Sequence, residues 1–306
     1  MTGRRSPAAA IALLGGALAV AGCGLGPGRG LPDVRLTVTH DFGAQPVLER
    51  AVGGVTESDT AMRVLERSAR VSTRYGGGFV QSIDGVEGEA RGSASYDWFF
   101  YVNGVESPIG AAAYALHGGE AIWWDYRDWS AAQDVPAVVG SWPEPFSGGY
   151  EGKRHPVAVE CMGGGGACAE VRSRLEGAGA PVATGAPSGA IRVLVGPWAR
   201  VRADPAAAQI EAGPQASGVF ARFSRRGRGF GLTGLGEDGK PARSFGAGAG
   251  LVAATRRYEA PPTWIVTGPS LPGVRAAAGL LDSAALRDHY AVAVEAGKET
   301  PLPAMR

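Results

Sequence analysis

Apolar and polar residues alternate along the first part of the chain in a way that is typical of strands with one buried face. Residues 34–39 alternate strictly and predict one strand, and residues 46–52 predict a second. Between residues 60 and 67 the apolar side chains then fall at helical spacing, directly after polar residues that can cap a helix. Further strands are expected at residues 98–102 and 122–126. Two strands, one helix and then more strands predict an α+β domain.

The second half of the chain repeats a different unit. Three short apolar runs are each followed by a glycine-containing loop and a segment with the features of a helix. These runs are residues 157–161, 191–195 and 264–267. Strand, loop and helix in this order predict parallel strands in an α/β domain over residues 152–303. An antiparallel pair is expected inside it at residues 218–223 and 229–232, and residues 132–151 are expected to link the two domains.

Residues 1–22 have the pattern of an export signal. Two arginines precede the apolar stretch 8–20, which is too short to span a bilayer comfortably. Small residues then precede Cys23, and this arrangement resembles the bacterial lipobox; an ordinary secretory signal with a chance cysteine is the alternative. The resemblance implies lipidation of Cys23 and a protein anchored to the cell membrane at its extracytoplasmic face. Residues 23–32 are rich in glycine and proline and would form a tether.

Composition and charge change this picture little. Hydrophobic residues make up 45% of the chain and charged residues 19%, as expected for a folded protein. The net charge is +1 and falls to −1 once the two leader arginines are removed. A chain so close to neutral offers no electrostatic case for a nucleic-acid partner.

Two cysteines follow the leader, Cys161 and Cys168. Thiols of exported proteins usually oxidise in pairs, and the four glycines between these two allow the loop to close, so a disulfide is expected. A metal site and a redox motif are the alternatives. Only His155 lies near the pair, and the spacing fits neither a zinc pattern nor Cys-x-x-Cys, so no metal is expected here.

Aromatic residues crowd the strands around an Asn-Gly turn, and four of the seven tryptophans lie between positions 98 and 129. Strand alternation places Phe99, Tyr101 and Trp123 on one face of the predicted sheet. That face either presents its rings to a small molecule or a protein partner, or is covered by the second domain. The candidate ligand-binding residues are Phe99, Tyr101, Asn103, Trp123 and Tyr126.

The same strands carry a family resemblance. Residues 98–104 read Trp-Phe-Phe-Tyr-Val-Asn-Gly, and residues 118–126 read Gly-Gly-Glu-Ala-Ile-Trp-Trp-Asp-Tyr. Together they resemble the bacterial family related to the C-terminal domain of transcobalamin and intrinsic factor, over residues 33–131; Glu120 stands where that family usually has Asp. The resemblance favours a β-grasp-like α+β N-terminal domain, followed by the α/β C-terminal domain, and implies cobalamin as a candidate ligand.

Three hypotheses on function follow. In the first, the protein is an anchored, non-catalytic binding module of the cell envelope, and the aromatic sheet binds a small molecule, such as a corrinoid, or a surface partner. In the second, it is a structural or assembly lipoprotein whose aromatic residues are buried between its domains. In the third, it is a carbohydrate-active enzyme that uses Asp97, Glu120 or Asp125, because paired carboxylates beside tryptophan are typical of glycosidases. The scattered histidines and the lack of a nucleophile elbow favour a protein that is not an enzyme.

Overall fold

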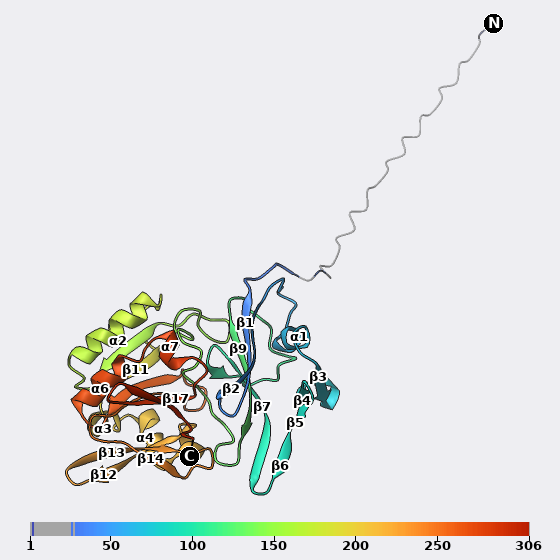
Figure 1. The fold of residues 1–306 in the computed structure, drawn as a ribbon. Coiled ribbons are helices and arrows are strands. Elements are labelled where there is room, and N and C mark those ends of the chain that lie inside the picture. The colour runs from blue at the N-terminus through green and yellow to red at the C-terminus, as the bar shows by residue number, and fades with distance from the viewer. Residues whose placement is uncertain (1, 3–25, 27, 306) are drawn as a thin grey trace.

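The computed structural model describes residues 2, 26 and 28–305, so the predicted signal and the lipidation site Cys23 lie outside the described residues. The protein is a mixed α/β structure with mostly strands, several sheets and few helices (Figure 1). Within the described residues the strands form two six-stranded and two three-stranded sheets. One large sheet belongs to residues 28–128, called the N-terminal unit below, and the other to residues 157–305, called the C-terminal unit.

The large sheet of the N-terminal unit has the strand order β2-β1-β9-β7-β6, with β8 paired to β7. Its strands are β1 (Val34–His40), β2 (Gln45–Val52), β6 (Glu89–Arg91), β7 (Ala94–Val102), β8 (Val105–Glu106) and β9 (Ala121–Asp128). β1 pairs antiparallel with β2 and parallel with β9, and β9 pairs antiparallel with β7. The predicted two-residue turn is confirmed, because Asn103 and Gly104 have φ values of 52° and 75° and join β7 to β8.

One face of this sheet packs inside its own unit. The helix α1 (Ala61–Glu66) begins after Thr60, whose side chain accepts a hydrogen bond from the Arg63 N–H, and it buries four apolar side chains. A small sheet lies near it, made of β3 (Val71–Arg74), β4 (Phe79–Ile83) and β5 (Val86–Glu87), with the short helix η1 (Tyr75–Gly77) between the first two strands. These elements form one apolar core with Trp98, Trp124 and Tyr126.

The large sheet of the C-terminal unit has the strand order β10-β11-β16-β15-β17-β18. Its strands are β10 (Val157–Cys161), β11 (Ile191–Pro197), β15 (Gly250–Thr255), β16 (Thr263–Gly268), β17 (Ala291–Glu295) and β18 (Lys298–Leu302). The three strands predicted to be parallel, β10, β11 and β16, do pair in parallel. The other half of the sheet is antiparallel, so the predicted repeat describes only part of this unit.

Helices and a small sheet surround this second large sheet. The helices are α2 (Gly166–Gly177), α3 (Trp198–Val201), α4 (Pro205–Ala212), α5 (Pro214–Ser217), α6 (Leu271–Ala278) and α7 (Ser283–Leu286). The small sheet is β12 (Ala221–Arg226), β13 (Gly229–Leu235) and β14 (Pro241–Ser244), which confirms the predicted antiparallel pair. The predicted disulfide is also present and joins Cys161, at the end of β10, to Cys168 in α2.

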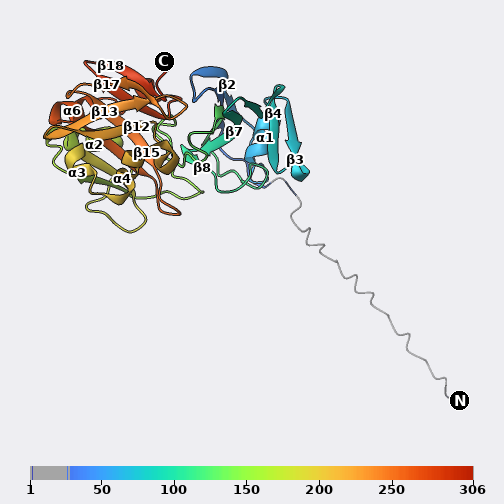
Figure 2. The same cartoon turned by 90° about the horizontal axis from the view of Figure 1, so that it is seen from below.

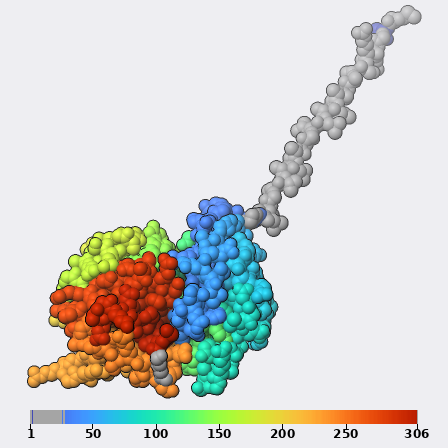
Figure 3. Space-filling model, in the orientation of Figure 1, coloured from blue at the N-terminus to red at the C-terminus, as the bar shows by residue number. Residues whose placement is uncertain are grey.

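The connecting segment, residues 129–156, is part of the core. Trp142 and Phe146 are buried in it, and both rings pack against Trp264 of β16, with centroids 5.9 and 4.8 Å apart. The views in Figures 2 and 3 show the two units side by side, with β8 at their contact and β1 and β2 directly against the C-terminal residues. Side chains of both units share one apolar cluster, so the segment predicted as a linker lies at a continuous interface.

Candidate functional site

The second face of the N-terminal sheet lies against the C-terminal unit. Tyr101 is fully buried, Trp123 is 2% exposed and Phe99 is half-buried. The Tyr290 ring, just before β17, packs edge-on against Tyr101 and Trp123, with centroids 5.7 and 5.3 Å away. The sequence left open whether these rings are exposed to a ligand or covered by the second domain. In the structure the C-terminal unit covers them.

The remaining two predicted ligand-binding residues lie elsewhere. Asn103 is buried. Its side-chain oxygen accepts a hydrogen bond from the Ala121 N–H (2.8 Å), and its side-chain N–H donates one to the Gly149 carbonyl (2.7 Å). Tyr126 is buried on the opposite face, and its hydroxyl donates to the Glu87 carbonyl at 2.8 Å. The structure thus places three of the five predicted residues on one face of the sheet, Tyr126 on the other and Asn103 in the turn after β7. It does not bring them together at one surface, and their ligand-binding role stays a prediction.

A polar network is buried within the aromatic interface. The Asp125 carboxylate is fully buried and accepts hydrogen bonds from the Thr39 hydroxyl (2.5 Å), the Gly43 N–H (3.1 Å) and the Tyr290 hydroxyl (2.9 Å). Burial raises the pKa of Asp125 to about 6, although these hydrogen bonds oppose the shift. The Trp123 indole N–H donates to the same Thr39 hydroxyl at 2.8 Å. The network ties β1, β9 and the C-terminal unit to one carboxylate.

Arg127 is the second charged group of the interface and is also fully buried. Its guanidinium lies 3.7 Å from the centroid of the Phe99 ring and donates to the carbonyls of Ala132 and Gln133, at 2.8 and 2.9 Å. Nearby, Glu106 accepts from the Val135 N–H at 3.1 Å, and burial raises its pKa to about 7 against the opposing charge of Arg127. The Tyr101 hydroxyl lies close to Tyr290 but makes no hydrogen bond of ordinary geometry.

The turn between β1 and β2 inserts into the C-terminal unit. Asp41, Phe42 and Gly43 have φ values of 55°, 58° and 84°, and such values are costly for the two residues that have a side chain. The Phe42 ring packs edge-on against Phe220 (4.9 Å) and Tyr290 (5.1 Å). A Cβ atom on Gly43 would lie 1.7 Å from the Asp288 carbonyl oxygen, so only glycine fits here. The packing of this turn offsets its backbone strain.

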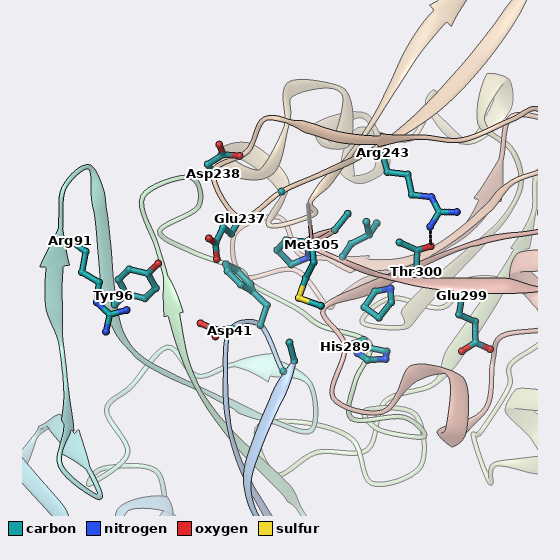
Figure 4. Close-up of a pocket in the computed structure, with 18 residues that line it drawn as sticks. Asp41, Arg91, Tyr96, Glu237, Asp238, Arg243, His289, Glu299, Thr300 and Met305 are labelled. Atoms are coloured by element: carbon teal, nitrogen blue, oxygen red, sulfur yellow. Dashed lines mark hydrogen bonds between the residues drawn. The ribbon is translucent and has the colours of Figure 1, made fainter.

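Beside this turn a cleft of about 790 Å³ lies between the two units (Figure 4). Its walls come from residues 41–44, the β6–β7 hairpin, residues 236–238, Arg243, His289 and residues 299–305. Domain contacts are common places for small-molecule sites, and the volume is in the usual range for one. None of the predicted site residues lines this cleft.

The lining of the cleft mixes charged and apolar groups. Figure 4 shows Asp41 and Glu237 on one side and Arg243, His289 and Glu299 on the other. Arg243 donates to the Thr300 hydroxyl at 3.0 Å, and burial lowers the pKa of His289. At the outer rim, Arg91 pairs with Glu89, and its guanidinium lies 5.0 Å from the centroid of the Tyr96 ring. The arrangement suits a ligand that has both a polar and an apolar side.

The carboxylates of the enzyme hypothesis are dispersed. Glu120 is buried and accepts from the Tyr114 hydroxyl and the His117 N–H, both at 2.9 Å. Asp97 accepts from the neighbouring Trp98 N–H at 2.8 Å, and burial raises its pKa. Neither of them, nor Asp125, lines the cleft. Within residues 28–305, no group of three or more His, Cys, Asp or Glu side chains is placed to hold a metal ion.

The match to a known family covers a minority of the chain. Residues 58–128, from just before α1 to the end of β9, match a family model described as a domain of unknown function, DUF4430. A solved structure from Ruminococcus gnavus ATCC 29149, named as a "putative metal binding protein", is 19% identical to this chain. The alignment covers 32% of this chain and 97% of that one, with a TM-score of 0.25. No curated protein matches the chain. Among the described helices, none has the length and apolar character needed to cross a membrane.

Proposed function

We propose that this protein is a non-catalytic binding module that takes a small molecule in the cleft between its two units. The observation that carries the proposal is the cleft itself: about 790 Å³, at the contact of two units, with charged groups beside apolar side chains. Aromatic packing and the Asp125 network hold the units together, so the cleft is preformed and its ligand binds without first ordering the walls.

The proposed cellular location and the proposed ligand rest on the sequence. The lipobox-like segment supports lipidation of Cys23 and an anchor on the extracytoplasmic side of the membrane. The β-grasp-like order of β1, β2, α1 and β9 is compatible with the resemblance to the transcobalamin-related family, and this resemblance makes a corrinoid the first ligand to test. A non-catalytic role is supported by the dispersal of Asp97, Glu120 and Asp125.

A second candidate function is a structural or assembly lipoprotein. The observation that favours it is the burial of Tyr101 and Trp123 between the two units, where they stabilise the interface and are out of reach of a ligand. In this case the two units serve as one rigid body that presents its outer surface to other envelope proteins.

Calorimetric titration of the soluble chain from Gly24 onward with cobalamin tests the proposal. Saturable heat is expected, and it should be lost in Ala44→Trp, which fills the cleft from the exposed end of the β1–β2 turn. Ala51→Trp is the matched control, because Ala51 is exposed on β2 and does not line the cleft. Absence of heat contradicts the corrinoid ligand. Heat that survives in Ala44→Trp contradicts the cleft as its site.

A further inference from the structure

A second cavity lies on the N-terminal unit, away from the cleft. It is a groove of about 280 Å³ between β4, the middle of β7 and the loop after β8. Its principal side chains are Phe79, Trp98, Phe100, Ile109 and Trp124. No residue of the interdomain cleft contributes to it, so it is a separate feature.

The groove lies where β7 lacks a neighbouring strand. On one side β7 pairs with β9 from Tyr96 to Val102. On the other side, β6 pairs only as far as Tyr96, and β8 begins to pair at Tyr101. Within the described residues no strand pairs with positions 97–100 on that side, and the Asp97 carboxylate accepts the Trp98 N–H there. Because β6 and β8 close both ends of the gap, a compact molecule fits it better than an added strand.

Apolar side chains form the walls of the groove. Phe79 and Ile109 are 40% and 48% exposed, and they stand at its rim. Phe100 stacks on Trp124 with centroids 4.8 Å apart and planes inclined by 20°. A Cβ atom on Gly110 would lie 2.8 Å from the carbonyl oxygen of Gly78, so the two loops meet closely and hold the rim in place.

One buried polar atom beside the groove lacks a partner. Trp124 is 2% exposed, and its indole N–H is buried without a hydrogen-bond acceptor. By contrast, the Trp98 indole N–H donates to the Val86 carbonyl at 2.8 Å. An unpaired buried donor costs about 1–3 kcal/mol. Because this N–H is enclosed, a ligand reaches it only when a neighbouring ring moves aside. A ligand that then places an oxygen near Trp124 would recover part of this free energy on binding.

We propose that this groove is a binding site for a small uncharged ring compound that carries a hydrogen-bond-accepting oxygen. The ring packs between Phe79, Ile109 and Phe100, and the oxygen accepts from the indole N–H of Trp124. The volume suits a compound of one or two rings. This inference is independent of the function proposed for the cleft.

Titration of the ¹⁵N-labelled chain with acetanilide, a neutral ring with an amide oxygen, tests the site. Each of the seven tryptophans contributes one indole N–H signal, and Trp124→Phe identifies the signal of Trp124 by its loss. We expect this signal to shift saturably at roughly millimolar concentration, as for a fragment of about ten non-hydrogen atoms. The signal of Trp264, also buried and without an acceptor but remote from the groove, should stay in place.

Two side-chain variants locate the probe. Phe79→Ala should weaken binding about fivefold or more, because the ring lines the groove. Tyr75→Ala is the matched control, since Tyr75 is 88% exposed next to Phe79 but does not line the groove, and it should bind as the parent does. An unmoved Trp124 signal, or equal affinity in Phe79→Ala, overturns the site.

Two further results would also overturn the proposal. If toluene, which lacks an acceptor, shifts the Trp124 signal as strongly as acetanilide, the hydrogen bond to the indole N–H is wrong. If the signal moves with protein concentration alone, a second copy of the chain covers the groove instead of a small molecule.

Discussion

The two faces of the N-terminal sheet are both aromatic, yet they are stabilised differently. On the face toward α1, the aromatic rings pack among aliphatic side chains of the same unit. The face toward the C-terminal unit combines rings with buried charge: Asp125 and Arg127 stand beside Trp123 and Tyr101 in the same alternation. The first face is covered by segments close to it in the sequence, whereas the second is covered by residues more than 150 positions away, such as Tyr290.

This difference shows what each face does in the molecule. An apolar face tolerates many partners, because its energy depends on buried area and little on direction. The face with Asp125 and Arg127 has hydrogen-bond requirements that only one arrangement of the two units meets, so it determines how the units dock. The cleft is a by-product of that docking: the turn that reaches Asp125 through Gly43 also forms one wall of the cleft.

The largest effect is expected from Gly43→Ala. The new methyl group would overlap the Asp288 carbonyl, and the positive φ of Gly43 adds a penalty. Together these should lower the free energy of unfolding by on the order of 4 kcal/mol, which urea unfolding would measure. Gly54→Ala is the matched control: its φ is +66° but no atom lies within 4 Å, so a loss of only about 1 kcal/mol is expected. Equal losses in the two variants would mean that the turn does not hold the units together.

A pH dependence should distinguish the face with buried charge from the apolar one. The pKa of Asp125 is raised to about 6 and that of Glu106 to about 7, above their ordinary values of 3.8 and 4.5. A raised carboxyl pKa contributes stability that is complete below the ordinary pKa and is lost as pH rises through the folded-state value. The free energy of unfolding should therefore fall between pH 4 and 8, by about 3 kcal/mol for each group.

Asp125→Asn is the variant that checks this dependence, by urea unfolding at several pH values. Because Asn cannot ionise, the variant should lose about 3 kcal/mol less than the parent between pH 4 and 8. Glu66→Gln, at an exposed position on α1, should leave the dependence as it is in the parent. A parent-like pH profile in Asp125→Asn would remove the buried carboxyl as its cause.

Much of the fold behind these two faces could be predicted from local sequence. Alternation placed Phe99, Tyr101 and Trp123 on one face, and the structure keeps them in one cluster. Local sequence also predicted the Asn-Gly turn, the three parallel strands and the disulfide, because each depends on neighbouring residues or on a repeated local pattern. The antiparallel half of the C-terminal sheet was not predicted. β17 and β18 form a local hairpin, and β15 and β16 are joined by a short loop. The pairing of β15 with β17, from Gly250 to Val294, joins distant segments and leaves no local pattern.

The site itself was beyond sequence reasoning. Whether the face with Trp123 is exposed depends on Tyr290, which lies in another unit and has no distinguishing motif. The cleft draws its walls from six separate segments, none of them unusual alone. One signal was available in the sequence. On β9 an Asp and an Arg alternate with Trp123 and so lie on the same face of the strand. Because a buried charge must be hydrogen-bonded, this pattern indicates an interface that supplies partners for the charged groups.

The smallest effect, and the sharpest test, compares two neighbouring tryptophans on opposite faces. Trp123→Phe removes a hydrogen bond to the Thr39 hydroxyl and ring volume from the interface, so a loss of about 2 kcal/mol is expected in urea unfolding. Trp124→Phe removes similar volume but also a buried donor that has no acceptor, so its loss should be about 1 kcal/mol or less. If Trp124→Phe costs as much as Trp123→Phe, hydrogen bonding does not distinguish the faces, and packing alone accounts for the stability of both.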